Sequence, residues 1–377
     1  MGKWIYETGC LGQNYQPISM SARIAIASGL SVLFSIAHVA ACDIETTDCG
    51  PWTFNSYFEN DLFGETDQHY TNGVRFSLIS PDLDEGFVDD SALPGWIQRY
   101  NDWVSFVHGL NPNLNREDEL QRNLVVSFGQ LMFTPTDIDA VDIVENDRPY
   151  AGYLYLGMGY HTRDNKQLDT IEFNLGIVGP WSQADETQDF VHDIRGIEKF
   201  QGWHNQLENE LGIQAVYEHK HRVLEKRFFS GAVEQDLIWH AGFSLGNVAT
   251  YLNAGAEYRI GLSLPKDFGT SSLRTGGDSS TPGLGDTRLN RDGGFDNFHL
   301  FAGFGSRLVG RDIFLDGNTF DDSHHVDKKY FVYDLAAGFS FTYHRWKFSY
   351  AQIFRSKEFK TQDDTHAFGS LSVSYTW

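Results

Sequence analysis

Apolar and polar residues alternate along most of the chain from residue 52 onward, in segments separated by turn residues. Alternation with a period of two is typical of β-strands, because successive side chains point to opposite faces. Segments of roughly ten residues in an even number are typical of single-chain transmembrane β-barrels. We predict an all-β protein, a transmembrane antiparallel barrel of about twelve strands. The predicted strands are 52–61, 70–80, 121–131, 150–160, 169–178, 212–220, 228–235, 248–263, 295–307, 329–343, 345–355 and 367–377.

The last predicted strand has the clearest pattern, GSLSVSYTW at 369–377. Its apolar face, Leu371 to Trp377 at alternate positions, suits lipid, and its serine and threonine face suits a barrel lumen. A terminal aromatic residue resembles the C-terminal signal of outer-membrane barrels, so we expect the barrel assembly machinery to recognise this end. The alternative, an edge strand of a soluble sandwich, is disfavoured by the export signal and the 15% aromatic content.

Three segments interrupt the strand pattern. Residues 81–120 contain LPGWIQRYNDWVSFVHGL and are expected to be partly helical, in a periplasmic insertion. Residues 264–294 are rich in Gly, Ser and Asp and predict a flexible loop. Residues 185–211 predict an amphipathic helix within an extracellular loop spanning 179–211, with Gly196 and Gly202 as candidate bends. Its apolar residues recur at intervals of three and four, namely Phe190, Ile194, Ile197, Phe200, Trp203, Leu207 and Leu211.

The N-terminus predicts an export signal. Arg23 precedes an apolar run at 24–41, which ends in small residues, so 1–41 is expected to be a signal peptide with Met20 as a candidate start. Residues 42–51 would then form an N-terminal periplasmic segment before the barrel at 52–377. Cys42 and Cys49 fit a disulfide, two unpaired thiols, or lipidation at Cys42. The formal charge of −22 argues against a nucleic-acid partner.

Strand parity places several polar residues on one rim. With both termini periplasmic, Asn60, Asp61 and Thr71 lie at the extracellular end, together with the helix that carries His192 and Glu198. An imidazole can accept a proton from water, so His192 is a candidate general base. Asp61 and Glu198 supply hard oxygen ligands suited to Ca2+, and Asn60 and Thr71 supply neutral hydrogen-bonding groups for an oxyanion.

Each of these positions, taken singly, also fits an ordinary structural role. Asn60 and Asp61 suit a strand-end turn, Thr71 suits a strand, and His192 lies off the apolar stripe and suits an exposed surface. His192 and Glu198 share no face of an ideal helix unless the chain bends near Gly196.

The chain resembles the outer-membrane lipid A deacylases that remove the 3′-acyloxyacyl group. The resemblance covers about residues 54–377 and rests on FENDLFGETDQHYTNG (58–73), GQLMFTP (129–135), NDRPYAG (146–152), LGIVGP (175–180) and VHDIRGIEKFQGWHNQLENELG (191–212).

This resemblance implies a twelve-stranded barrel and a calcium-dependent esterase whose site lies between the barrel wall and an extracellular-loop helix. His192 would activate water, Asp61 and Glu198 would hold Ca2+, and Asn60 and Thr71 would support the arrangement, with Glu198 also counted among the catalytic residues. We expect lipid A or lipopolysaccharide and outer-membrane lipids as partners, an outward-facing active site, and a monomer.

Two features depart from the family pattern. Leu62 stands where the characterised family has a second acidic residue. The loop TPTDIDAVDIVEND at 134–147 carries five acids and no Lys or Arg before Arg148, whereas family enzymes carry basic residues there. The acidic loop keeps a phospholipase-like esterase open as an alternative, beside a non-enzymatic barrel or pore.

Overall fold

The computed structural model describes residues 51–60, 69–83, 95, 98–99, 102–103, 120–270, 278–289 and 295–377. The predicted signal peptide, the three cysteines, Asp61 and most of the predicted insertion at 81–120 lie outside these residues. Among the described residues, no helix has the length and apolar character required to cross a membrane.

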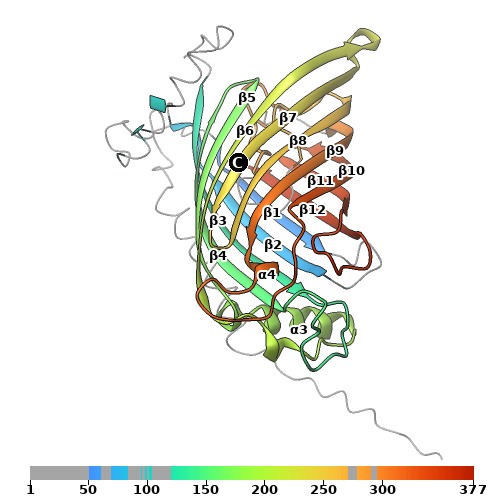
Figure 1. The fold of residues 1–377 in the computed structure, drawn as a ribbon. Coiled ribbons are helices and arrows are strands. Elements are labelled where there is room, and N and C mark those ends of the chain that lie inside the picture. Colours follow the sequence, from blue (N-terminus) through green and yellow to red (C-terminus); the bar gives the residue numbers. More distant parts are fainter. Residues whose placement is uncertain are drawn as a thin grey trace, which may run out of the picture.

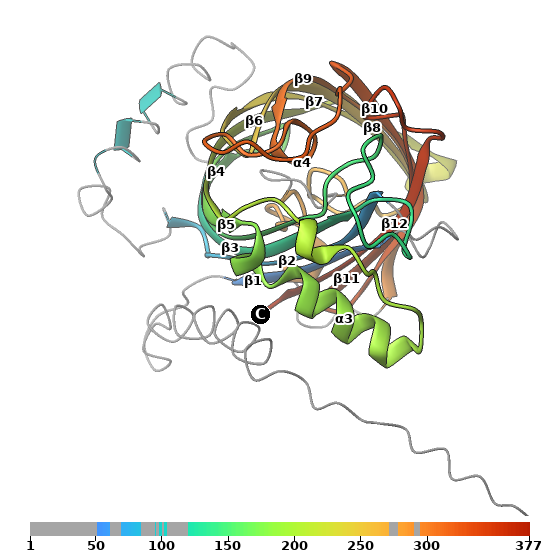
Figure 2. The same ribbon diagram turned by 60° about the horizontal axis from the view of Figure 1, so that its bottom comes forward.

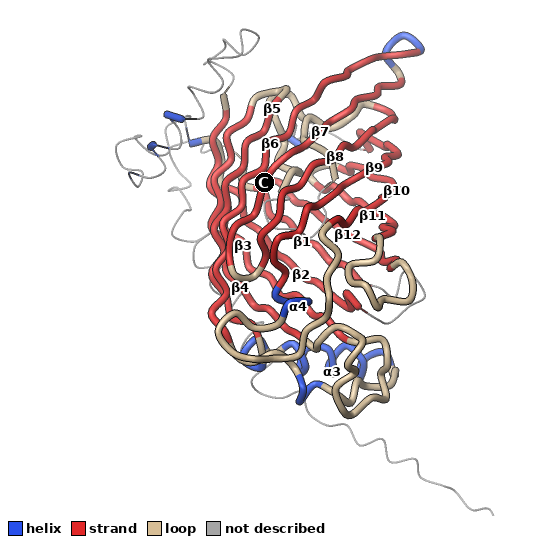
Figure 3. The backbone as a smooth tube through the Cα atoms, in the orientation of Figure 1, coloured by secondary structure: helices blue, strands red, loops and turns tan. Residues whose placement is uncertain are grey.

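Twelve antiparallel strands close into a barrel, as Figures 1 and 3 show, and this confirms the predicted fold class. Each strand pairs with its neighbours in sequence, and Thr53 of β1 pairs with Thr376 of β12 to close the sheet. The strands are β1 (Thr53–Asn60), β2 (His69–Ile79), β3 (Gln121–Thr134), β4 (Ala151–Arg163), β5 (Gln167–Val178), β6 (Glu210–Phe228), β7 (Val233–Gly246), β8 (Ala249–Leu262), β9 (Phe295–Asp312), β10 (Phe331–Tyr343), β11 (Trp346–Arg355) and β12 (His366–Thr376).

The helices are short and lie in the connections between strands. Helix α3 (Ala184–Arg195) lies between β5 and β6, and α4 (Ile313–Asp316) lies between β9 and β10. Figure 2 shows both at the same end of the barrel, which we call the α3 end. The 3-10 turns are η5 (Pro180–Ser182), η6 (Trp203–Asn205), η7 (Phe229–Gly231) and η8 (Thr287–Leu289).

The two faces of the barrel wall differ in polarity. Large apolar side chains are exposed on the outer face, among them Met158, Phe173 and Leu175, whereas inward residues of the same strands such as His161 and Glu172 are buried and polar. On β12, Leu371 is exposed while Ser370, Ser374 and Thr376 are buried, as the alternation at 369–377 predicts. An apolar exterior around a polar interior is the arrangement of a membrane barrel.

The β8–β9 connection enters the lumen instead of forming the predicted flexible loop. Asp267 is fully buried, with Arg259 Nη1 at 2.7 Å, Lys347 Nζ at 2.6 Å and Arg288 Nη2 at 3.1 Å. Asp278 is buried too and accepts a hydrogen bond of 2.6 Å from Arg75. The prediction of flexibility at 264–294 is therefore wrong for its described residues, 264–270 and 278–289, because Asp267 and Asp278 in them pair with buried cations.

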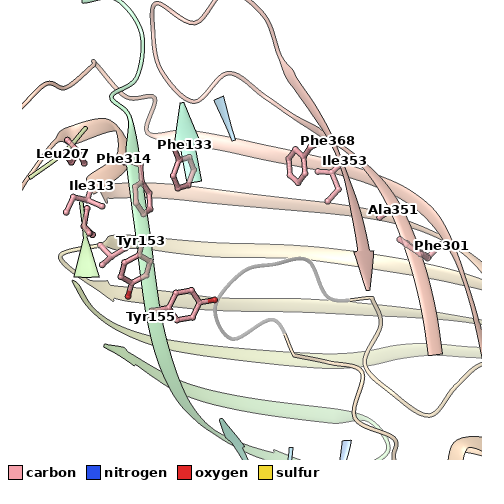
Figure 4. Close-up of a cluster of buried hydrophobic side chains, with 13 residues drawn as sticks. Phe133, Tyr153, Tyr155, Leu207, Phe301, Ile313, Phe314, Ala351, Ile353 and Phe368 are labelled. Carbon is pink, nitrogen blue, oxygen red and sulfur yellow. The ribbon is translucent and has the colours of Figure 1, made fainter. Parts of the chain in front are cut away.

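The α3 end of the lumen is filled by apolar side chains. Phe314 of α4 stacks on Phe133 with 4.2 Å between ring centroids and also contacts Tyr153. Figure 4 shows this cluster, which extends along the inner wall to Phe301. A cavity of about 220 Å³ remains between α4 and the β8–β9 connection. The lumen is thus occupied from both ends.

Candidate active site

The outer face of the barrel at the α3 end carries a second apolar cluster, separate from the lumen. Met132 lies between the inward residues Leu131 and Phe133, so its side chain points outward, yet it is fully buried. It is covered by residues of α3 and the adjoining loops. The cluster consists of Met132, Tyr150, Ala184, Phe200 and Trp203.

Helix α3 approaches the wall closely at its N-terminal end. A Cβ atom on Gly152 of β4 would lie 2.1 Å from Ser182 Oγ and 2.3 Å from Ala184 Cβ, so only glycine fits there. Gln130 of β3 donates a hydrogen bond of 2.7 Å to the backbone carbonyl of Ser182. These contacts fix the start of α3 on the outer face of β3 and β4.

One face of α3 packs toward the protein. Ala184, Gln188 and His192 are spaced by four residues and are 0%, 3% and 3% exposed. The Oε1 atom of Gln188 accepts a hydrogen bond of 2.6 Å from Trp203 Nε1, which ties the helix to the segment after it. The expectation of an exposed His192 is therefore wrong. It is the apolar residue Ile194 that is exposed, at 69%.

The helix ends earlier than predicted. Gly196, with φ +66°, caps α3 in the left-handed conformation, so the predicted helix over 185–211 stops at Arg195. Beyond it the chain turns back, and the Nδ1 atom of His192 lies 2.5 Å from the backbone carbonyl oxygen of Glu198. The Phe200 ring lies 5.9 Å from the His192 ring. The bend expected near Gly196 is confirmed, and it brings Glu198 to His192.

The backbone contact selects the tautomer of the neutral imidazole. A carbonyl oxygen only accepts hydrogen bonds, so Nδ1 carries the proton and donates it to Glu198. The remaining nitrogen, Nε2, then holds the lone pair that a general base needs. The carboxylate of Glu198 lies on an exposed residue.

Asn60 and Thr71 lie on the neighbouring strands at the same end. Asn60 follows the lumen-facing Glu59, so its side chain points outward, and it is 3% exposed. It pairs across the sheet with Asn72, which is equally buried. Thr71 is the extra residue of a bulge in the pairing of β2 with β3. Bulges re-aim the chain and are frequent beside active sites.

Some residues of the site region were not singled out from the sequence. One of them is Gln188, which binds Trp203. Its spacing of four residues from His192 places both on one face of the helix and could have identified it from the sequence. The Oδ1 atom of Asn72 is buried and has no hydrogen-bond partner in the described part of the chain. Asn72 stands in the YTNG motif. Burial raises the pKa of Tyr150 to about 12, so its phenol stays protonated against the covering loop.

No metal site forms among the described residues. No group of three His, Cys, Asp or Glu side chains suited to a metal occurs within the described ranges, and Asp61 lies outside them. Of the predicted site residues, the structure joins His192 with Glu198 through a backbone contact, and it places Asn60 and Thr71 on adjacent strands of the nearby wall.

The sequence as a whole matches the model of the family described as Outer membrane protein LpxR, over residues 26–377. The chain belongs to this family. The match confirms the resemblance to the outer-membrane lipid A deacylases and the outer membrane as the location of the LpxR-family barrel. No curated protein matches the sequence.

One solved structure shares the architecture. LpxR from Salmonella typhimurium superposes with a TM-score of 0.64 at 19% identity, covering 86% of this chain and 99% of that one, which shows a shared fold. The β domain of the Bordetella autotransporter BrkA has a TM-score of 0.38 at 8% identity, covering 86% and 98%. The latter value is too low to support any conclusion about this chain.

Proposed function

We propose that this LpxR-family protein is an outer-membrane esterase that hydrolyses the 3′-linked acyloxyacyl ester of lipid A, with His192 as the general base. The observation that carries the proposal is the buried His192 beside the outer wall, with Nδ1 held by the Glu198 carbonyl. A histidine fixed in this way is prepared to take a proton at Nε2. A site on the outside of the barrel is also reachable by a lipid from the membrane.

The proposed reaction is hydrolysis by activated water. Nε2 of His192 would take a proton from a water molecule as its oxygen attacks the ester carbonyl, and the resulting imidazolium would return the proton to the leaving alkoxide. The Glu198 carbonyl would stabilise the imidazolium through Nδ1. Asn60 and Thr71 would donate hydrogen bonds to the oxyanion. The site would face the extracellular side, where the outer leaflet holds lipid A.

Calcium is part of the proposal on chemical grounds alone. Asp61 and Glu198 would hold the ion, because carboxylate oxygens are the ligands that Ca2+ prefers. A bound Ca2+ would polarise the ester carbonyl. Glu198 contacts His192 through its backbone carbonyl, and no described contact places its carboxylate at the site.

The experiment is acyl release from a defined lipid. Detergent-purified protein is incubated with lipid A, intact and after enzymatic dephosphorylation, with Ca2+ or with EDTA, and the products are weighed by mass spectrometry. We expect loss of the 3′-acyloxyacyl group with Ca2+ and none with EDTA. If both lipids stay unchanged in Ca2+, the proposal fails.

A phospholipase-like esterase is the second candidate. The exposed acids Asp137, Asp139, Asp142 and Glu145 favour it, since they suit the ammonium group of a zwitterionic phospholipid better than a bare phosphate. Release of fatty acid from phosphatidylethanolamine, with no release from lipid A, would select this function.

A further inference from the structure

The cavity inside the barrel lumen is lined by a carboxylate, that of Glu257, which forms no ion pair in the described part of the chain. Both of its oxygens lie 3.0 Å from the backbone nitrogen of Thr270, which has one hydrogen to share between them. Two cations of the inner wall, Arg259 and Lys347, are bound to Asp267 at 2.7 and 2.6 Å. A carboxylate enclosed in this way is unfavourable until a positive charge reaches it, either a proton or a bound cation.

The lysine and arginine side chains that line the cavity already have acidic partners. Arg355 Nε lies 2.8 Å from Asp334, and Lys220 Nζ lies 3.3 Å from Glu218. Arg307 Nη2 lies 3.9 Å from Asp334. None of these bases forms an ion pair with the carboxylate that Thr270 holds.

Two hydroxyl groups of the cavity wall also lack a hydrogen-bond partner within the described ranges. They are the Oγ1 atom of Thr270 and the phenolic oxygen of Tyr153, and both atoms are buried. The amide of Thr270 binds Glu257, so the hydroxyl of the same residue lies near the carboxylate. Hydroxyl and carboxylate oxygens both accept hydrogen bonds. The wall is therefore suited to a ligand that donates several hydrogen bonds at one end.

Aromatic rings form much of the remaining wall. Phe268, Tyr155 and Phe301 line the cavity, and Figure 4 shows the last two inside the barrel. The face of an aromatic ring attracts a cation. The cavity measures about 220 Å³. An apolar cavity of about 150 Å³ holds benzene, so a molecule of about ten non-hydrogen atoms fits this space.

We propose that the luminal cavity binds a small primary ammonium ion with an aromatic or aliphatic body. The ammonium group donates to the Glu257 carboxylate and to the Thr270 hydroxyl, and the body packs among the rings. Such a group has three N–H donors and supplies the positive charge that the carboxylate requires. The site lies inside the barrel, so it is separate from the candidate esterase site on the outer wall and does not depend on that activity.

The test compares two ligands of the same shape. The purified full chain is folded into detergent with para-fluorophenethylamine, or with the uncharged para-fluorophenethyl alcohol, and bound ligand is followed by fluorine NMR at pH 8. Adding the ligand during folding lets it reach the lumen. We expect a saturable resonance from one bound amine per chain and at least about tenfold weaker binding of the alcohol. Equal affinities, or no saturable binding of the amine, would overturn the inference.

One variant tests the charge. Glu257→Gln keeps an oxygen for the Thr270 amide and removes the negative charge, so the affinity for the amine should fall to that for the alcohol. If the folded variant still prefers the amine, the carboxylate does not bind the ammonium group and the inference is wrong.

A second variant tests the location. Gly305 lines the cavity and a Cβ atom there would meet nothing within 4 Å, so Gly305→Leu should fill the cavity and abolish amine binding. The matched control is Ala302→Leu, an exposed position of the same strand on the outer face, where binding should persist. Heat-modifiable migration on gels checks that each variant is folded. Unchanged amine binding by folded Gly305→Leu would place the ligand outside the cavity and contradict the proposal.

Discussion

The Nδ1 atom of His192 lies 2.5 Å from the backbone carbonyl oxygen of Glu198, six residues further along the chain. The contact exists only because α3 ends at Gly196 and the chain reverses. The end of a helix and one left-handed glycine thus determine which ring nitrogen of the buried His192 faces a backbone carbonyl.

Replacing His192 should strongly slow catalysis without unfolding the barrel. Loss of a general base costs between about 10²- and 10⁴-fold in rate, so His192→Ala should lower acyl release by that factor. The control is His204→Ala, an exposed histidine of η6 in the same loop. Both variants should keep the heat-modifiable migration of a folded barrel on gels. Normal release by folded His192→Ala would exclude His192 as the base.

We expect substitutions at Gly196 to affect activity only through the backbone conformation at this position. A Cβ atom there would meet nothing within 4 Å, so any effect of substitution comes from φ +66°. An L-residue in this conformation costs about 1 kcal/mol, enough to lower the population of the productive loop about fivefold. We expect Gly196→Ala to reduce the rate by about this factor. Asparagine tolerates the left-handed region, so Gly196→Asn should lie closer to wild type. Equal rates for Ala and wild type would show that the reversal does not limit activity.

The strands could be predicted because successive side chains of a barrel strand alternate between the membrane and the lumen, which leaves a period of two in the sequence. Strands β6 and β7 are the exceptions: 212–220 and 228–235 were predicted, whereas β6 runs Glu210–Phe228 and β7 runs Val233–Gly246. For β7 the reason is Ile238, an inward apolar residue that packs on Leu168 and Phe268 in the lumen. It gives three consecutive apolar residues, Leu237 to Trp239, and hides the alternation.

The packing of the site and of the luminal segment could not be predicted, because both depend on tertiary contacts that a local sequence pattern does not show. Lys347 and Asp267 are 80 residues apart, so a Gly-, Ser- and Asp-rich segment read alone predicts a solvated loop. His192 was expected at the surface because it lies off the apolar stripe. In a membrane protein that stripe can be the exposed side, as Ile194 is, while the polar face turns inward.

The buried carboxylate of Glu358 should make the folded barrel less stable as the pH becomes acid. Burial raises its pKa, but Arg355, Arg148 and Arg307 outweigh burial and lower it to about 2. The carboxylate has its usual pKa in the unfolded chain, so its contribution is complete above about pH 4.5 and is lost as the pH falls toward 2. The shift corresponds to about 3 kcal/mol.

The measurement is thermal unfolding in detergent between pH 2 and pH 7. Glu358→Gln should unfold at a lower temperature than wild type at pH 7, and the difference should shrink as the pH falls through that window. Asp363→Asn, an exposed carboxylate of the same loop, should behave as wild type. A pH-independent difference would mean that Glu358 acts through packing and not through charge.

The luminal segment of the β8–β9 connection should keep the barrel from conducting ions. Asp267 and Asp278 bind cations of the inner wall on several strands, so the segment is fixed across the lumen and not merely folded over its mouth. Wild-type protein in planar bilayers should therefore show no steady conductance. Replacing 264–289 with a short Gly-Ser linker should open a pore at that end, limited by Phe314 and its neighbours at the other.

Replacing the η7 tip, 229–232, with Gly-Ser is the control, because it lies at the same end but outside the lumen, as Figure 1 shows. It should stay closed. Because the candidate site lies on the outer face of the barrel, both replacements should retain acyl release if they fold. Steady conductance by the wild type would show that the segment leaves the lumen in a membrane, and a pore function would then have to be reconsidered.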